Sequence, residues 1–474
     1  LSAWKKIMEA AEEHNDPGKF TTFNAYEWTV RNQEPESASY HRNVIFKSSK
    51  APKRPFSSFD SNNPEQLWSW MDGLRSNGLD SLAIPHNSNG SNGQVFKKYK
   101  FDGSPIDKEY SVQRMRNEPI VEITQIKGTS ETHPRLSPND KWANFEIVNS
   151  RKGKRTAYSE PDGSYVRQGL QKGLALKHEE RGNPFKIGFI GSTDTHNGAY
   201  IFDESDNVGT AAILTSPEVR GSIPIPNETL TEDIKNSVFI AEEDQGFYSG
   251  GETISNSVGG LAAVWAKANT RDSIFEALSN KETYATSGTR IRLRFFAGEN
   301  LTNLDFNDEE FISKMYENGV PMGSDLILSD TKKPSFIIWA QKDKNSAPLQ
   351  RIQIIKGFYS EKDRETKEHL IDVVCSDGLK PDPNSKLCAS NNAMVNIETC
   401  EFSKNKGASE LKTTWVDEEY DPNIETFYYV RVLENPTCRW STWDAIKNNY
   451  EPRQGIDEII QERAWSSPIW VNSN

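Results

Sequence analysis

An aspartate and a histidine stand one residue apart where an apolar run ends, in IGFIGSTDTHNG (residues 187–198). The apolar residues are typical of a buried strand, and the Asn-Gly pair that follows is typical of a loop. In an extended chain, residues two apart point to the same side, so Asp194 and His196 can reach one point. We therefore expect Asp194 and His196 to bind a metal ion at the mouth of a strand.

Other histidines and glutamates also lie beside predicted strands. The full set of expected ligands is Glu27, His41, His86, Glu122, Asp194 and His196. Mixed imidazole and carboxylate ligands suit Zn, Mn or Fe, whereas Ca and Mg sites are usually made of oxygen atoms. Each residue alone also has a simpler explanation. A histidine at a strand end can be a hydrogen-bonded loop residue, Glu27 can pair with an arginine, and Glu122 can orient a ligand.

A polar run, Asn-Ser-Asn-Gly-Ser-Asn-Gly at residues 87–93, follows His86 directly. One interpretation is a mobile surface loop. The other is a ring of neutral donors and backbone N–H groups around an anion, with positive charge from Arg42 and Lys127. The chain contains no Gly-x-Ser-x-Gly elbow, Walker loop or dinucleotide fingerprint, so it lacks the usual support for a serine nucleophile, an NTPase or a Rossmann site.

The elements around these residues alternate between helix and strand. A helix is predicted from Trp4, and a second one has Asn63 as its cap and Pro64 in its first turn. Strands are predicted to end near Glu27, His86, Glu122 and Asp194, and a last helix follows Thr270. Alternation of this kind predicts parallel strands in an α/β fold, such as a barrel, with functional groups at the carboxyl ends of the strands. We assign this region to residues 1–288.

After residue 288 the pattern changes to strands separated by polar loops, as in FIIWA, RIQIIKGF and FYYVRVL. We expect residues 289–474 to form a β-rich, sandwich-like domain whose tail packs back on the body. The aromatic residues of this domain could bind a carbohydrate or a protein partner, although aromatic residues are more often buried in a core. The residues considered for this role are Trp339, Trp440, Trp443, Trp465 and Trp470.

Composition restricts the possible partners. The 474 residues carry a net charge of −12 without a Lys/Arg stripe, which argues against a nucleic acid. The chain has no run of about 20 apolar residues and no signal peptide at its start, so we expect a soluble protein without a membrane span. The 4 cysteines lie at Cys375, Cys388, Cys400 and Cys438. They predict one or two disulfides, with the pairing open, and a periplasmic or secreted location. Zinc binding is the alternative, but no Cys-x-x-Cys spacing supports it.

Several long motifs resemble a bacterial family of unknown function, the domain-of-unknown-function 3604 family, within the polymerase-and-histidinol-phosphatase (PHP) superfamily. The motifs include FTTFNAYEWT, IPHNSNGSNG, VEITQIKGTSE, GSTDTHNG and ERAWSSPIW, and the resemblance covers nearly the whole chain. It implies a distorted barrel of seven strands with two or three metal ions at the strand ends. By this resemblance Glu27 is the bridging carboxylate, His41 and His86 are mid-chain ligands, and Asp194 and His196 form the closing Asp-x-His. Glu122 resembles a strand-end residue near the site.

The chain departs from the PHP pattern because it contains no His-x-His, the motif that opens such domains, and because it lacks the first barrel strands. Either an N-terminal segment has been removed and stays bound as a separate fragment, or this member has lost part of the site. We favour the first explanation, since a barrel without its opening strands would expose unpaired edges and core.

The expected function is metal-dependent hydrolysis of a small anionic ester, most simply a phosphoester, by a water that the metals activate. His86 or His133 would protonate the leaving group, and Arg42 or Lys127 would steady the anion. Sulfate ester or lactone hydrolysis can use the same site. A non-catalytic secreted binding protein is the alternative from another class.

Overall fold

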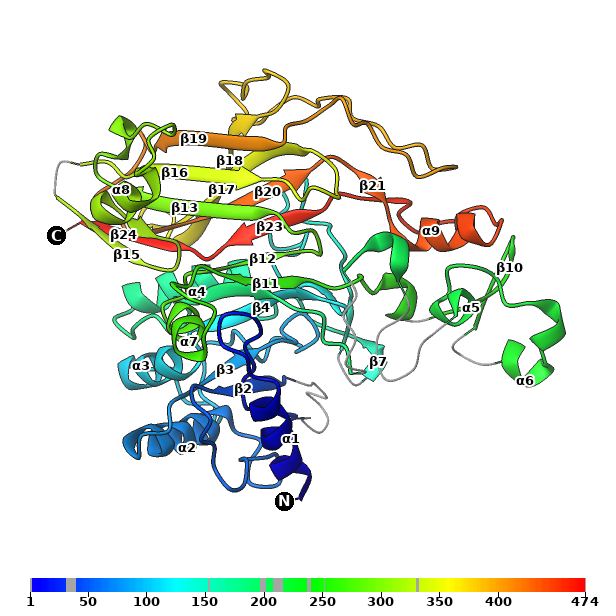
Figure 1. Cartoon of the computed structure of the whole chain (residues 1–474), viewed down its shortest axis with the longest axis horizontal. Helices are drawn as coiled ribbons and strands as arrows, with labels where there is room; N and C mark the ends of the chain where they lie inside the picture. The colour runs from blue at the N-terminus through cyan, green and yellow to red at the C-terminus, as the bar shows by residue number, and fades with distance from the viewer. Residues whose placement is uncertain are drawn as a thin grey trace.

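The computed structural model describes residues 2–30, 40–151, 154–196, 202–207, 216–236, 240–250, 252–329 and 332–473. It is a mixed α/β structure in which the N-terminal helices and strands lie below a β-rich layer formed by the C-terminal half of the chain (Figure 1). Within the described ranges, no helix combines the length and the apolar character that a membrane span requires.

The N-terminal part starts with helix α1 (Ser2–Glu13) and a three-stranded antiparallel sheet of β1 (Ala25–Trp28), β2 (Arg42–Phe46) and β3 (Ser81–Pro85). Helix α2 (Pro64–Ser76) connects β2 to β3. It begins as predicted, because the side chain of Asn63 accepts a hydrogen bond from the backbone N–H of Glu65. One face of the sheet and the apolar side of α2 share a core that contains Trp28, Val44, Leu67 and Met71.

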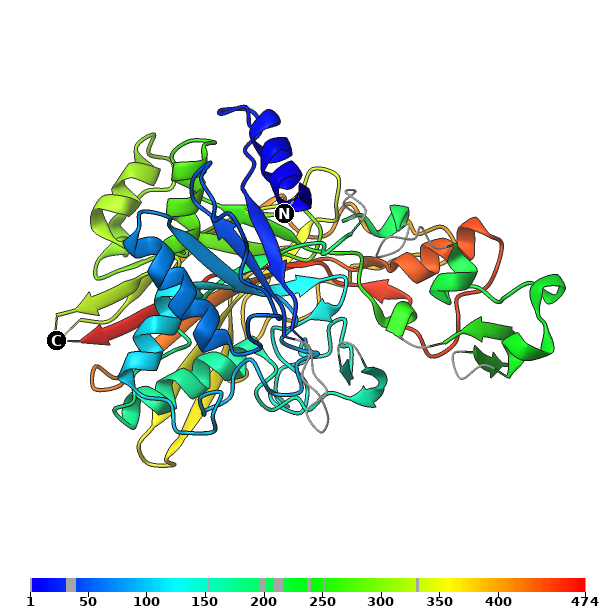
Figure 2. The same cartoon turned by 90° about the horizontal axis from the view of Figure 1, so that it is seen from below.

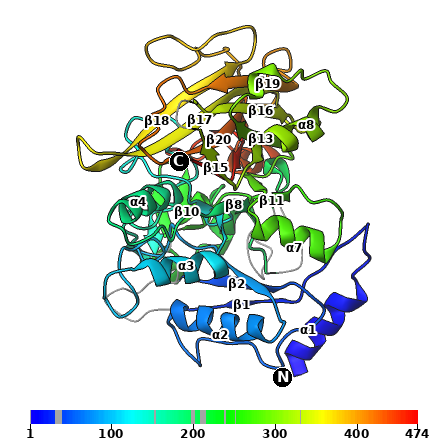
Figure 3. The ribbon, with the colours of Figure 1, turned by 90° about the vertical axis from the view of Figure 1, so that its left-hand side faces the viewer.

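Strands β4 (Ile120–Gln125) and β8 (Gly188–Gly191) pair in parallel, and the short β5 (Gly128–Thr129) follows β4. Helices α3 (Lys108–Asn117) and α4 (Val166–His178) precede these two strands, and α7 (Arg271–Ser279) lies beside the small N-terminal sheet (Figure 3). A second core joins this region to the other face of that sheet, through Ile84, Ile120, Ile190, Phe275 and Leu278.

The described residues confirm the mixed α/β class and one parallel pair, β4 with β8, but they do not confirm the predicted barrel of parallel strands without its first strands. Their sheets are open, and β1, β2 and β3 are mutually antiparallel, as register pairs such as Trp28 with Arg42 and Arg42 with Pro85 show. The physical reason lies in the connections. A helix such as α2 can connect two strands that run in the same direction or in opposite directions. The alternation of helix and strand along the chain therefore does not determine whether the strands are parallel or antiparallel.

The C-terminal half forms two sheets with a common core. The larger one has 8 strands, namely β11 (Leu261–Val264), β12 (Thr283–Thr286), β23 (Arg463–Ser466), β20 (Thr426–Glu434), β17 (Leu349–Ser360), β18 (Glu365–Cys375), β24 (Ile469–Ser473) and β15 (Asp325–Leu328). The smaller consists of β14 (Val320–Pro321), β13 (Arg292–Gly298), β16 (Ser335–Gln341) and β19 (Glu410–Val416), with α8 (Phe311–Asn318) against it. Apolar residues of both sheets, including Phe295, Ile338, Ile354 and Val430, pack together.

The two halves are joined by pairing and by a buried ionic cluster. Strand β12, which precedes the predicted boundary at residue 288, pairs with β23 near the end of the chain. In the cluster, the Arg431 guanidinium contacts Glu131 at 3.1 Å and Asp140 at 2.8 Å, and Trp465 donates to Glu131 at 2.6 Å. Each partner of Arg431 is itself buried, so the cluster fixes the loop after β5 against β20.

A projection extends from one end of the molecule (Figure 2). It contains α5 (Pro217–Arg220), α6 (Glu232–Lys235), the hairpin of β9 (Ile240–Glu243) and β10 (Gly246–Ser249), and α9 (Trp440–Lys447). Arg220 on α5 forms an ion pair with Asp444 on α9 at 2.7 Å, which ties the insertion to the C-terminal part. Two small pairs lie elsewhere, β6 (Ser150–Arg151) with β7 (Lys154–Tyr158) and β21 (Thr437–Cys438) with β22 (Ile459–Ile460).

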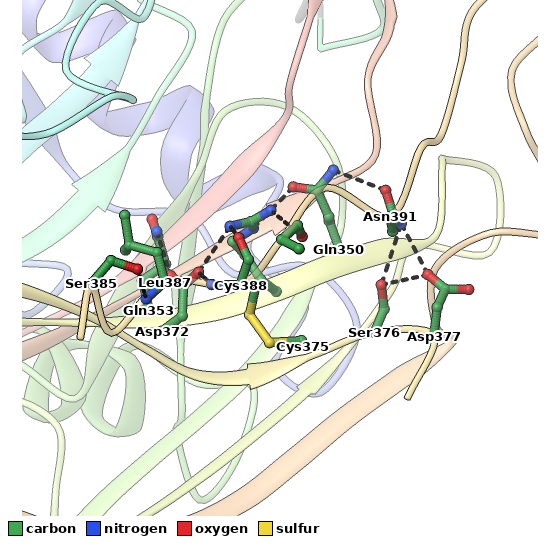
Figure 4. Close-up of a disulfide and its surroundings, with 12 residues drawn as sticks. Gln350, Gln353, Asp372, Cys375, Ser376, Asp377, Ser385, Leu387, Cys388 and Asn391 are labelled. Carbon is green, nitrogen blue, oxygen red and sulfur yellow. Dashed lines mark hydrogen bonds and ion pairs between the residues drawn. A yellow bond between two sulfur atoms is a disulfide. The ribbon is translucent and has the colours of Figure 1, made fainter. Parts of the chain in front are cut away.

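All four cysteines form disulfides, Cys375 with Cys388 and Cys400 with Cys438, so the disulfide prediction is confirmed and the zinc alternative is wrong. The first disulfide lies beside Asp372, whose carboxylate accepts hydrogen bonds from the backbone N–H of Cys388 at 2.6 Å and from Gln353 at 2.7 Å (Figure 4).

Candidate metal centre

Three of the predicted ligands meet because of the register of the small N-terminal sheet. Arg42 at the start of β2 pairs with Pro85 at the end of β3, so His41 and His86 lie one step beyond this pair on neighbouring strands. Glu27 pairs with Asn43, and Asn43 with Ile84. Since side chains alternate between faces along a strand, Glu27, His41 and His86 all project from the same face.

Their ligand atoms converge on one point. Oε1 of Glu27 lies 2.6 Å from Nδ1 of His41 and 3.2 Å from Nε2 of His86, and the ligand atoms of the three residues all lie within 4.8 Å of one another. Within the described part of the chain, no other group of histidine, cysteine and acidic residues meets this criterion. One carboxylate and two imidazoles form a donor set suited to Zn, Mn or Fe.

Burial and charge act against each other at this centre. Burial alone would raise the pKa of Glu27, but hydrogen bonds from His41 and His86 outweigh it, and the pKa of Glu27 is lowered. Burial likewise opposes the charged form of His86, which is 1% exposed, yet the hydrogen bond to Glu27 and the nearby Glu122 and Asp194 raise the pKa of His86. The centre therefore favours positive charge close to Glu27.

Two further predicted residues lie near His86. Glu122 is buried in β4, its Oε1 atom has no hydrogen-bond partner among the described residues, and burial raises the pKa of Glu122 to about 8. Asp194 accepts a hydrogen bond of 2.9 Å from Gln125, which also contacts the backbone carbonyl of His86 at 3.4 Å. His196, two residues after Asp194, is exposed.

The end of β8 is held closely against the larger sheet, which places Asp194. A Cβ atom on Gly191 would lie 2.8 Å from the carbonyl oxygen of Leu261 and 2.9 Å from that of Thr286, so this position requires glycine. Asp194 itself has φ +54°, in the left-handed region that costs energy for most residues other than glycine. Conformations of this kind are often found at functional sites.

The profile of a family described as "Protein of unknown function (DUF3604)" matches residues 1–473. The chain belongs to this family. No curated protein and no solved structure matched the chain.

Two residues that the sequence analysis placed in this site have other partners. The Arg42 guanidinium is 2% exposed and contacts Glu118 at 2.8 Å and the Tyr40 carbonyl oxygen at 2.6 Å. It is committed to a buried ion pair. His133 accepts a hydrogen bond from the backbone N–H of Arg135 and contacts Asn149 at 3.3 Å, and burial lowers its pKa. These contacts do not support the predicted roles of Arg42 and His133.

The polar run after β3 is not the mobile surface loop that one interpretation predicted, because its side chains are packed inside the protein. Asn87, Ser88, Asn89 and Ser91 are each at most 3% exposed. The side-chain polar atoms of Asn87, Ser88 and Ser91 have no hydrogen-bond partner among the described residues. Buried polar groups of this kind normally find partners, so their unused hydrogen-bonding capacity beside His86 favours the functional interpretation.

Lys127 lies beside the same loop. Its carbonyl oxygen accepts a hydrogen bond of 2.9 Å from Asn89, and its ammonium group contacts the Ser130 hydroxyl. Sequence reasoning missed Gln125 and Ser130, which link this region to Asp194 and Asn89. The available signal for Gln125 was its place at the end of β4, between the two predicted residues Glu122 and Lys127.

Proposed function

We propose that this protein is a metal-dependent hydrolase of the PHP superfamily, and that it acts as a phosphoesterase. One observation carries the proposal. A carboxylate on β1 and two imidazoles, one just before β2 and one just after β3, bring their ligand atoms within 4.8 Å of one another, and no other group of the described residues meets this criterion. Divalent cations in such a site supply Lewis-acid chemistry and lower the pKa of water.

The residues fit a divalent cation for two reasons. Glu27, His41 and His86 are held by strand register rather than by mobile loops, so the donor atoms are positioned in advance. Glu122 adds a buried carboxylate with an unpartnered oxygen near His86, and a carboxylate in this setting is costly unless a cation or a proton balances it. Asp194 and His196 complete the proposed set of ligands, for Zn, Mn or Fe.

The protein groups around the centre are suited to binding an anion. The ammonium group of Lys127 would offset negative charge on the substrate, and the buried donors of Asn87, Ser88 and Ser91 would hold its oxygen atoms. Nε2 of His86 lies 3.2 Å from Glu27. If His86 does not bind a cation, its imidazole would hold a proton or return it to the leaving group. Together these groups favour a small phosphoester as substrate.

The test is a hydrolysis assay with purified protein and Zn, Mn or Fe, on phosphomonoesters, phosphodiesters, sulfate esters and lactones. We expect turnover of phosphoesters that a chelator abolishes, and loss of turnover in His86→Ala. His178→Ala, which changes a half-exposed histidine near Glu361, is the matched control and keeps its activity. Turnover that survives both the chelator and His86→Ala would contradict the proposal. Preference for sulfate esters or lactones would retain the site but change the substrate.

A non-catalytic binding protein is the second candidate, and the structure removes part of its support. Trp440, Trp465 and Trp470 are at most 1% exposed, so they belong to the core. Trp339 and Trp443 retain partial exposure.

The two disulfides are consistent with an oxidising compartment. We therefore propose a periplasmic or secreted location, which cell fractionation with an antibody would test.

A further inference from the structure

Helix α8 covers one end of the outer face of the smaller sheet, through contacts with Phe296 of β13. On β13 and the neighbouring β16, Arg294 pairs with Trp339 and Arg292 pairs with Gln341. Side chains alternate between the two faces of a strand, so all four side chains project from the same face as Phe296. This end of the face reaches the surface, since Arg292 is exposed and Trp339 is half-buried.

A cleft of about 160 Å³ lies on this part of the sheet. It is lined by Trp265, Arg292, Arg294, Ile312, Trp339 and Gln341. Sites for drug-sized ligands begin at roughly 300 Å³, so this cleft suits a single ring of a ligand rather than a larger molecule enclosed as a whole. None of the residues assigned to the metal centre lines the cleft, and the proposed hydrolase chemistry does not use it.

Two half-buried tryptophans form the apolar part of the cleft. Trp265 follows β11, its indole N–H donates to the carbonyl oxygen of Leu293 at 2.8 Å, and the Arg294 guanidinium lies 3.4 Å from the centre of its ring. The Trp339 ring packs edge-on against Phe311 of α8, with 5.9 Å between the ring centres. Both rings are thus held in place by their neighbours. Rigid aromatic rings at a surface provide contact area for a ligand at a low cost in conformational entropy.

Arg292 supplies an unpaired positive charge at the cleft. The residue is exposed, and its guanidinium forms no hydrogen bond and no ion pair with the described residues. The chain contains 68 acidic residues and 56 Lys or Arg residues, so acidic partners are not scarce. A guanidinium offers a planar fork of donors that matches the two oxygens of a carboxylate. The cleft is therefore suited to an anionic ligand.

The other charges around the cleft are balanced within the protein. Arg294 donates to the Tyr316 hydroxyl at 2.9 Å, and this hydroxyl in turn donates to Glu282. On β19, Glu410 forms an ion pair with Lys412 at 2.9 Å. The charge that remains for a ligand is the unpaired guanidinium at the start of β13.

We propose that this cleft binds a sugar ring that carries a carboxylate, as in a uronic acid unit of a polysaccharide. A sugar ring has an apolar C–H face and a rim of hydroxyls, which matches a cleft with tryptophan walls and polar groups at its edge. The carboxylate pairs with Arg292, the C–H face packs on Trp339, and the Gln341 amide contacts a ring hydroxyl. The rest of the polymer extends along the surface. The proposal goes beyond the hydrolase function and does not depend on the metal centre.

The test is isothermal titration calorimetry of the full chain with trimers of galacturonate, mannuronate and glucuronate, after treatment with a chelator and dialysis. We expect at least one trimer to bind, and its methyl ester, which has the same rings without charge, to bind at least tenfold more weakly. Indole-3-acetate, an aromatic acid without a sugar ring, should also bind more weakly. Failure of all three trimers to bind, equal binding of the methyl ester, or tighter binding of indole-3-acetate would overturn the proposal.

Variants locate the binding site. Arg292→Gln should weaken binding of the trimer by about tenfold or more, because the carboxylate loses a charge-assisted hydrogen bond. Arg364→Gln, which removes an exposed arginine in the turn between β17 and β18, is the matched control and should leave binding unchanged. Trp339→Leu keeps an apolar side chain against Phe311 but removes the flat ring, and it should also weaken binding. Binding that is unweakened in Arg292→Gln would overturn the assignment, whether or not Trp339→Leu folds.

Discussion

Nδ1 of His41 lies 2.6 Å from Oε1 of Glu27, because β1, which contains Glu27, pairs antiparallel with β2, which starts one residue after His41. His41 precedes β2 and His86 follows β3, so the antiparallel register places the beginning of one strand beside the end of the next. A shift of one residue in this register would send either histidine to the opposite face of the sheet. The candidate centre therefore depends on strand pairing that the sequence does not state directly.

Gln125 is expected to position the centre through its neighbours, because its side-chain amide contacts both the Asp194 carboxylate and the His86 carbonyl oxygen. Residues that orient ligands typically contribute about 10–100-fold to metal affinity. Gln125→Ala should weaken Zn affinity by about this factor, as measured by competition with a chelator of known affinity. Gln168→Ala is the control, since Gln168 contacts Asp162 on the surface. Identical affinities in the two variants would contradict the positioning role.

The sequence predicted the local elements better than their directions. The Asn63 cap of α2, the strand before His86 and the strand before Asp194 are present, because caps and apolar runs are local signals. Whether two strands pair in parallel depends on contacts between distant segments, and here the parallel expectation for β1, β2 and β3 was wrong. Glu27, His41 and His86, three of the six predicted ligands, nevertheless lie together, since each lies beside a strand end in either arrangement.

The contacts of Arg42 and His133 could not be predicted from the sequence for a related reason. A cation beside candidate ligands is equally able to neutralise a buried acid, and Glu118, the partner of Arg42, is distant in the chain. The burial of the loop after His86 was also hidden, because its composition is that of a surface loop. Only the packing around it separates the two interpretations.

Arg42 is expected to act on stability rather than on catalysis. Glu118→Gln leaves the buried Arg42 and Arg114 without their anionic partner, which should lower the free energy of unfolding by about 3–5 kcal/mol. Urea denaturation would measure this loss, with Glu109→Gln on the exposed side of α3 as the control. Arg42→Gln should also destabilise the protein while the metal content stays the same. A stable Arg42→Gln protein with a raised KM would instead support a role in anion binding.

Glu434 should make stability depend on pH. Burial raises the pKa of Glu434 from 4.5 to about 8, despite the hydrogen bond from Ser346. Between these two pKa values the folded state keeps a proton that the unfolded state has lost. The contribution of Glu434 to stability is therefore complete below pH 4.5 and decreases up to about pH 8, by at most about 1.4 kcal/mol per pH unit.

Glu434→Gln removes this ionisation, so the difference in unfolding free energy between the variant and the parent should grow in favour of the variant as the pH rises to about 8. Urea denaturation across this pH range would measure the difference. Glu398→Gln, at an exposed position, should show no such trend. A constant difference between Glu434→Gln and the parent would show that the carboxyl group titrates normally in the folded state.

The two disulfides should contribute unequally to stability, because their cysteines are separated by 13 and 38 residues. On loop-closure entropy, replacing Cys375 and Cys388 by Ser should cost about 3 kcal/mol, and replacing Cys400 and Cys438 about 4 kcal/mol. Denaturation of each double variant under oxidising conditions would measure these losses. Reducing agent should destabilise the parent but have no effect on a variant that lacks all four cysteines. A parent that is insensitive to full reduction would contradict the expected contribution.

The metal content of the purified protein tests the central claim most directly. Elemental mass spectrometry would be carried out on the parent, on His41→Ala/His86→Ala and on the control His178→Ala/His369→Ala, each after incubation with Zn, Mn or Fe and removal of free metal. We predict at least one ion per chain in the parent and in the control, and loss of that ion from the folded His41→Ala/His86→Ala variant. A folded parent that retains no metal, or a folded double variant that retains as much as the parent, would contradict a metal centre at Glu27, His41 and His86.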